Sequence, residues 1–191
     1  MTKQKDTAGR LQLLLISLVF FGPLILATWL YFSGAGLQPK GRTNHGQLIE
    51  PLLDIGDALP DSEIHAYNDG RWLLVYTNTG SCDSSCEFAL LTLRQSRLML
   101  GKEMDRLLRV FLHGDTAPDT VFLNSEHSGL ITLRDSNFSE LLEKKRPPKL
   151  AAGGYFLIDP LGNLVMYFRP DIDPSDMVDD IDHLLELSRI G

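Results

Sequence analysis

Cys82 and Cys86 are the residues of this chain whose type and spacing best suit chemistry. They occur in the segment TNTGSCDSSC (residues 77–86), after an apolar run and at the start of an amphipathic stretch. A helix N-terminus stabilises a thiolate through the helix dipole, and a C-x3-C spacing puts both sulfurs on one side of a helical turn. The pair can therefore exchange disulfides, bind a soft metal ion such as Cu(I), or form a structural bridge.

The short spacing between the cysteines bears on the choice among these roles. A disulfide that closes one turn removes little conformational entropy from the unfolded chain, so it contributes little stability. We therefore favour redox or metal chemistry, and a static bridge in an oxidising compartment stays open as the alternative. Two cysteines also exclude a disulfide-rich scaffold and an all-cysteine zinc site.

The composition of the chain excludes other classes of function. The chain has 191 residues and a formal net charge of −7, and it contains no basic stripe, so we expect no nucleic-acid partner. The sequence contains no P-loop, G-x-S-x-G or H-E-x-x-H motif. These absences leave the cysteine pair as the leading candidate for chemistry.

Residues 11–32 (LQLLLISLVFFGPLILATWLYF) form an uncharged apolar stretch. At 1.5 Å per residue such a helix spans about 33 Å, which exceeds the roughly 30 Å hydrocarbon core of a bilayer. We predict one transmembrane helix, tolerant of Pro23, that anchors the chain in the lipid bilayer. A cleaved signal peptide is the alternative, although its apolar region is ordinarily shorter.

Basic residues on either side of this stretch predict its orientation. Three precede it and two follow it, namely Lys3, Lys5 and Arg10, then Lys40 and Arg42. This bias places residues 1–10 in the cytoplasm and the soluble part in the periplasm, as a single-pass protein of the cell inner membrane. Residues 33–50 are then a linker, and residues 51–191 form the soluble domain.

Hydrophobic periodicity and turn residues predict the elements of the soluble domain. We expect a hairpin from 64–67 and 71–76, a helix over 86–100, strands at 107–112 and 121–123, and a helix starting at 135 or 136. A second hairpin over 155–158 and 164–168 and a closing helix over 174–190 complete the order. This alternation predicts an α/β fold with a central sheet flanked by helices, whose first crossover is parallel.

These features together resemble the Sco/SenC family. The resemblance rests on the strand, C-x3-C loop and helix, on the segment YFLIDPLGN at residues 155–163, and on the N-terminal anchor. Members of that family are membrane-anchored, thioredoxin-like proteins that deliver copper to cytochrome c oxidase subunit II or reduce its thiols. The resemblance implies a thioredoxin-like sheet, a dithiol that reduces partner cysteines or carries Cu(I), and a cytochrome c oxidase subunit or another assembly factor as partner.

Two departures from the family pattern shift the expected chemistry. Glu87 follows the second cysteine where the family usually has proline, and Ala151 is nearest to the position of the family's copper-binding histidine. Alanine cannot ligate a metal, so a third ligand would come from elsewhere. His113 follows the strand 107–112 and lies at the sheet edge of the cysteines if the strands are parallel. We therefore take Cys82, Cys86 and His113 as the candidate Cu(I) ligands.

The missing histidine places thiol–disulfide exchange above copper carriage. In such an exchange one sulfur attacks the partner and the other resolves the mixed disulfide. We assign the attack to Cys82, because it lies in the loop. A non-catalytic, membrane-tethered interaction module with a structural disulfide stays open as the alternative. We expect His127 in a polar loop and His65 on a strand facing solvent, both without a chemical role.

Overall fold

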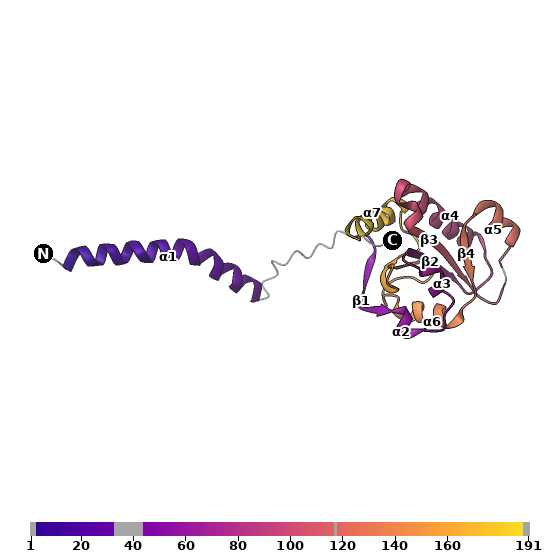
Figure 1. Cartoon of the computed structure of the whole chain (residues 1–191), viewed down its shortest axis with the longest axis horizontal. Helices are drawn as coiled ribbons and strands as arrows, with labels where there is room; N and C mark the ends of the chain where they lie inside the picture. The colour runs from indigo at the N-terminus through magenta and orange to yellow at the C-terminus, as the bar shows by residue number, and fades with distance from the viewer. Residues whose placement is uncertain (1–2, 33–43, 117, 189–191) are drawn as a thin grey trace. The chain divides into compact units, whose positions relative to one another are not determined.

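The computed structural model describes residues 3–32, 44–116 and 118–188, in two compact units divided between Thr43 and Asn44. The first unit contains one helix in its described part, α1 (Lys3–Phe32) (Figure 1). Most of the predicted linker, residues 33–43, lies outside the described residues. The two units are therefore described separately.

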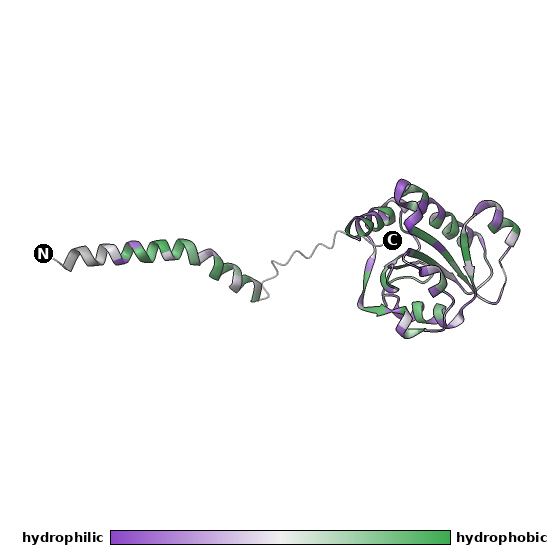
Figure 2. Cartoon of the chain, viewed as in Figure 1, coloured by the Kyte–Doolittle hydropathy of each residue, from purple (hydrophilic) through white to green (hydrophobic). Residues whose placement is uncertain are grey.

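The helix α1 has the length and composition of a membrane span. Its segment Gly9–Leu30 is long and apolar enough to cross a membrane once. Large apolar side chains such as Leu18 and Phe20 are exposed along it, which suits contact with lipid and not with a protein core (Figure 2). The helix continues through Pro23, so the proline does not interrupt the predicted span.

The second unit is built on a six-stranded sheet with the strand order β1-β6-β5-β2-β3-β4. The strands are β1 (Gln47–Asp54), β2 (Trp72–Asn78), β3 (Leu107–His113), β4 (Leu130–Leu133), β5 (Tyr155–Ile158) and β6 (Asn163–Phe168). The strands β2, β3 and β4 are parallel, whereas the β2–β5, β5–β6 and β6–β1 pairs are antiparallel. The sheet is therefore mixed, and the predicted parallel crossover from β2 to β3 is confirmed.

Helices cover both faces of this sheet. They are α2 (Ile55–Ala58), α3 (His65–Asn68), α4 (Ser84–Met99), the 3-10 helix η1 (Gly101–Arg106), α5 (Thr120–Glu126), α6 (Ser136–Lys145) and α7 (Pro174–Leu187). The helices α4, α5 and α7 pack on one face, and α2, α3 and α6 on the other (Figure 1). Each face carries its own hydrophobic cluster. The predicted α/β fold with a central sheet flanked by helices is therefore confirmed.

The strand β2 is the centre of the core. Six of its seven residues are buried, and it pairs with β3 on one side and with β5 on the other. Because side chains alternate along a strand, Leu74 and Tyr76 enter the cluster under α4 and α7, while Leu73 and Val75 enter the opposite cluster. The apolar run at residues 72–76, predicted as a strand buried on both faces, is confirmed as such a strand.

The predicted first hairpin is wrong in its first half. Residues 65–68 form the short helix α3 and do not pair with β2. The Asn68 side-chain amide donates hydrogen bonds to the carbonyls of Arg71 and Asp159, at 2.8 and 3.0 Å. These bonds tie the turn before β2 to the β5–β6 connection, so the Asp-Gly pair ends a helical turn and does not close a hairpin.

The strand predicted at residues 121–123 is also wrong. Residues 120–126 form α5, because the Asp119 carboxylate accepts hydrogen bonds from the backbone N–H groups of Val121 and Phe122 and caps the helix. The third parallel strand is β4, which the sequence analysis did not predict. In addition, β1 begins at Gln47, inside the stretch assigned to the linker.

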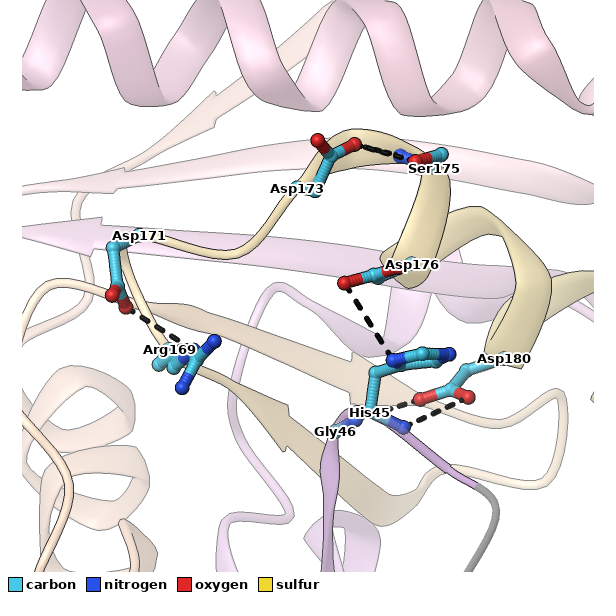
Figure 3. Close-up of polar contacts among 8 residues, drawn as sticks. All are labelled: His45, Gly46, Arg169, Asp171, Asp173, Ser175, Asp176 and Asp180. Atoms are coloured by element: carbon cyan, nitrogen blue, oxygen red, sulfur yellow. Dashed lines mark hydrogen bonds and ion pairs between the residues drawn. The ribbon is translucent and has the colours of Figure 1, made fainter.

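The second unit begins with a contact between α7 and the residues just before β1. The Asp180 carboxylate is 7% exposed and accepts hydrogen bonds from the backbone N–H groups of His45 and Gly46, at 3.1 and 2.7 Å (Figure 3). His45 Nδ1 also lies 3.6 Å from Asp176 Oδ2. A Cβ at Gly46 would lie 2.5 Å from Met166 Sδ and 2.6 Å from Phe168 Cε1, so a larger residue would have to displace these buried side chains. These contacts fix the chain on α7 just before β1.

Replacing Asp180 with alanine removes the acceptor for both N–H groups. We expect the free energy of unfolding to fall by about 2 kcal/mol, since hydrogen bonds to a charged group are lost in a buried position. The matched control is Asp179→Ala, an exposed neighbour on the same helix, with an expected change within about 0.5 kcal/mol. Urea unfolding of the full chain in detergent micelles measures both. Equal effects of the two substitutions would contradict the role of Asp180.

Candidate functional site

A disulfide joins Cys82 and Cys86 in the connection from β2 to α4. The two Cα atoms are 5.0 Å apart. Cys86 lies in the first turn of α4 and is completely buried, whereas Cys82 lies in the preceding loop and is partly exposed. One sulfur-bearing residue therefore faces solvent, and the other is enclosed by the core.

Asp83, between the two cysteines, caps α4. Its Oδ1 accepts hydrogen bonds from the backbone N–H groups of Ser85 and Cys86, each at 3.1 Å, and from the Ser85 hydroxyl at 2.6 Å. The Ser85 hydroxyl, followed by the Cys86 N–H, lowers the pKa of the Asp83 carboxyl, so it is ionised at neutral pH. The helix N-terminus favours a thiolate at Cys86, whereas this adjacent negative charge disfavours one.

Aromatic side chains form the buried side of the site. Tyr76, near the end of β2, stacks on Phe111 with ring centroids 5.7 Å apart, and its ring lies 5.8 Å from that of Tyr155. Burial raises the pKa of Tyr76 to about 12, with further contributions from Tyr155 and Asp83. Cys86 belongs to the same hydrophobic cluster, and Cys82 packs against it. The disulfide therefore has an apolar layer on its inner side.

A polar groove of about 1120 Å³ lies beside the disulfide loop. Neighbours of both cysteines line it, namely Ser81, Asp83 and Ser85. The helix α6 contributes Glu140 and Glu143 to the same groove. Its size is comparable to that of ligand-binding clefts in other proteins, so a partner segment can approach the loop from this side.

The structure places His113 at the sheet edge of the cysteine loop. In the parallel register His113 lies opposite Asn78, the last residue of β2, and it lines the polar groove. The Gly114 N–H donates to Asn78 O at 3.0 Å, and a Cβ at Gly114 would lie 2.2 Å from Thr79 O. This close approach holds the end of β3 against the loop that leads to Cys82.

The described residues do not form a three-ligand metal site in the disulfide state. No group of three or more His, Cys, Asp or Glu side chains that could hold a metal ion occurs among residues 3–32, 44–116 and 118–188. Cys82 and Cys86 are bonded to each other, so the disulfide must be reduced before they can bind a soft ion. A reduced pair offers two thiolates, and His113 is at the same edge of the sheet.

Two family models match the chain. One is described as a transmembrane-like, thioredoxin-like, C-terminal domain and matches residues 72–188, more than half of the chain. The chain belongs to this family. The second model, a transmembrane-like N-terminal domain, matches residues 4–34, which include most of α1. Together with the apolar length of α1, this match indicates a single-pass membrane anchor.

Solved Sco structures share the fold of this transmembrane-like, thioredoxin-like protein. Apo Sco1 from Thermus thermophilus has a TM-score of 0.50 and 18% identity, covering 62% of this chain and 82% of the other. Copper-bound ScoI from Arabidopsis thaliana has a TM-score of 0.51 and 18% identity, with coverages of 64% and 89%. Copper-bound yeast Sco1 has a TM-score of 0.51 and 21% identity, covering 64% of this chain and 80% of the other. The predicted thioredoxin-like, Sco-like fold is confirmed. No curated protein matches the chain.

Near Ala151, backbone groups of the transmembrane-like, thioredoxin-like protein form hydrogen bonds with the Tyr167 hydroxyl. The Ala151 carbonyl accepts a hydrogen bond from the Tyr167 hydroxyl, which in turn accepts one from the Gly154 N–H. Burial raises the pKa of Tyr167 to about 12, which keeps this hydroxyl a donor at neutral pH. Residues 151–154 are alanine and glycine, so they present no side chain that could ligate copper.

Two other histidines differ from the sequence analysis, since His127 lies in a loop as predicted but is buried, and His65 lies on a helix and not on a strand. His127 is only 3% exposed, follows α5, and contacts the Phe122 ring with centroids 5.1 Å apart. His65 begins α3, and its Nε2 lies 2.7 Å from Leu59 O. The apolar residues 121–123 were the available signal for a buried His127, but they were assigned to a strand.

The raised tyrosine pKa values predict how stability depends on alkaline pH. An unfolded tyrosine ionises near pH 10. The buried neutral hydroxyl of Tyr76 therefore stabilises the fold below about pH 10, and this contribution is lost as pH rises towards 12. Tyr76→Phe should remove one late-ionising phenol from an ultraviolet titration and weaken the alkaline loss of stability. An unchanged number of late-ionising phenols in the folded variant would contradict this.

Proposed function

We propose that this membrane-anchored protein exchanges thiols and disulfides with a periplasmic partner through Cys82 and Cys86. The observation that carries the proposal is the unequal placement of the two residues, one partly exposed in the loop and one buried in α4. The thioredoxin-like fold supports it, because thiol chemistry at a strand–loop–helix junction needs a helix N-terminus beside the sulfurs. The bias of basic residues around α1 supports the periplasmic side.

The exposed residue determines the order of the steps. In the reduced protein the Cys82 thiolate attacks a partner disulfide, forms a mixed disulfide, and releases one partner thiolate. Cys86 then loses its proton and attacks the Cys82 sulfur, which forms the Cys82–Cys86 disulfide and releases the second partner thiolate. Two electrons pass to the partner, and the disulfide form of this protein is the product, which a separate dithiol reductant must reduce before the next cycle.

A cytochrome c oxidase subunit or another assembly factor is the partner that we propose. Support comes from the shared fold of Sco proteins and from the membrane anchor, which keeps the dithiol near membrane-bound partners. The groove beside the loop would receive the partner segment, and Glu140 and Glu143 of α6 are among its lining residues. The competing role is a static bridge in a tethered interaction module.

Single cysteine substitutions distinguish attack from resolution. Cys86→Ser keeps the attacking thiol and removes the resolving one, so a mixed disulfide with the partner should accumulate about tenfold over wild type. Cys82→Ser leaves only the enclosed thiol and should accumulate none. Non-reducing electrophoresis of membrane fractions, with the bands identified by mass spectrometry, measures the adduct. The double Cys82→Ser/Cys86→Ser variant is the control for non-specific bands.

The reduction potential separates exchange from a static bridge. An exchanging dithiol should cycle at a moderate potential, whereas structural disulfides have potentials below about −300 mV. A potential in the structural range, together with no adduct in Cys86→Ser, would contradict the proposed exchange and favour the tethered interaction module.

Carriage of Cu(I) is the second candidate function. The Arabidopsis and yeast Sco structures contain copper. In this chain the observation in its favour is the position of His113 opposite Asn78, beside the loop that carries Cys82. Copper would be cargo held by the reduced pair and this histidine, because thiolates and imidazole both suit Cu(I).

A Cu(I) competition titration of the fully reduced chain in detergent micelles tests this candidate. One-to-one binding should be lost in Cys82→Ser/Cys86→Ser and weakened about tenfold or more in His113→Ala. His183→Ala, an exposed residue of α7, should bind like wild type. Binding that does not respond to the double substitution would remove copper carriage and leave disulfide exchange.

A further inference from the structure

Arg109 is a buried cation with two unpartnered donor groups. It lies in the middle of β3 and is only 5% exposed. Its Nη2 donates to Ser128 O at 2.6 Å, but Nε and Nη1 have no hydrogen-bond partner. Among the residues that the structure describes, no ion pair involves Arg109. A buried charge without a partner is costly, so these donors require an explanation.

His127 places a second orphaned group beside this guanidinium. It is 3% exposed, its Nδ1 has no partner, and it precedes Ser128, whose carbonyl contacts Arg109. Burial, followed by the charges of Arg109 and Arg94, lowers the pKa of His127. Burial and the charges of Arg97 and Arg94 lower the pKa of Arg109 in the same way. Each group therefore lies in a positive environment.

Further donors without acceptors come from the same layer of the fold. Trp72 Nε1 and Ser96 Oγ are also buried and have no partner. Trp72 pairs with Leu107, two residues before Arg109 on the same face of the sheet, and belongs to the cluster under α4. Arg97 of α4, next to Ser96, donates to Leu107 O. Buried donors without acceptors therefore come from β2, β3 and α4 on this face of the sheet.

Nearby carboxylates do not balance the positive charge. Glu126 lies 3.5 Å from Arg94, and Asp105 lies 3.0 Å from Arg97. Three guanidinium groups thus face two carboxylates, and both carboxylates are mostly exposed at the surface. The positive charge that no carboxylate pairs is that of Arg109, which is buried, whereas Glu126 and Asp105 lie at the surface. Water satisfies a donor but carries no compensating charge, whereas an anion does both.

We propose that Arg109 and His127 form the centre of a buried site for a small inorganic anion such as chloride. The anion accepts hydrogen bonds from Arg109 Nε or Nη1 and from the Nδ1–H group of a neutral His127 ring. Because Arg109 and His127 are almost completely covered by protein, the side chain of a partner protein cannot reach these donors. The site is separate from the disulfide, which follows β2 at the opposite end of α4.

Chloride-dependent stability of the full chain in detergent micelles tests the site. Chloride replaces gluconate at constant sodium concentration, so ionic strength is fixed. At ten times its Kd, a ligand bound only by the folded state lowers the unfolding equilibrium constant about tenfold. The melting temperature of wild type should therefore rise and saturate with chloride. Arg109→Met, which keeps the apolar stem, should show no such rise.

Arg169→Met is the matched control. It removes an exposed arginine, paired with Asp171 at 3.3 Å, from a different part of the domain. This variant should respond to chloride like wild type. A response of the same size in all three proteins, or none in wild type, would overturn the proposal and indicate that water alone satisfies the donors.

A direct measurement keeps the proposal falsifiable if Arg109→Met does not fold. Crystals of the wild-type chain grown in sodium bromide should show an anomalous peak within hydrogen-bonding distance of Arg109 Nε or Nη1. A well-defined map with ordered Arg109 and no bromide peak at the guanidinium would overturn the site.

Discussion

The parallel pairing of β2 with β3 is the interaction on which the site depends. It aligns Asn78 with His113, so both strands end at the same edge of the sheet and the loops that follow them begin side by side. The connection between them must cross the sheet, and α4 provides that crossing. The first turn of α4 then carries Cys86, and the loop before it carries Cys82. Without this register, the sulfurs and the histidine would not share an edge.

The environment of the disulfide follows from how α4 begins. A capped helix N-terminus favours negative charge, and Asp83 already provides it through two backbone N–H groups. A thiolate at Cys86 therefore competes with a carboxylate for the same dipole, while the apolar layer around Tyr76 withholds water from it. Cys82 is outside this competition because it precedes the cap. The asymmetry between the sulfurs is thus a consequence of local helix capping as well as of burial.

Elements marked by an apolar run, a helical period or a clear turn were predictable from the sequence, whereas elements without such a signal were not. The run 72–76 and the turn at 159–163 identified β2 and the β5–β6 hairpin. The helices α3 and α5 were missed because their few apolar residues also suit a strand. Helix formation there rests on hydrogen bonds that the Asn68 amide donates and the Asp119 carboxylate accepts. The edge strand β1 was missed because Pro51 and a register shift break its alternation. From the sequence, Arg109 reads as a solvent-facing strand residue. It is buried because β3 lies between β2 and β4 in the sheet.

The helix α4 links the two regions of unusual charge in this layer. Its N-terminus lies at the disulfide, and its second half carries Arg97, which donates a hydrogen bond to the carbonyl of Leu107. The negative end of a helix dipole is worth about half a charge, and it acts within the last turn. That contribution favours the arginines near the end of α4, but it cannot neutralise a whole buried guanidinium. A bound anion supplies the remaining charge at Arg109 without disturbing the N-terminal end that positions the cysteines.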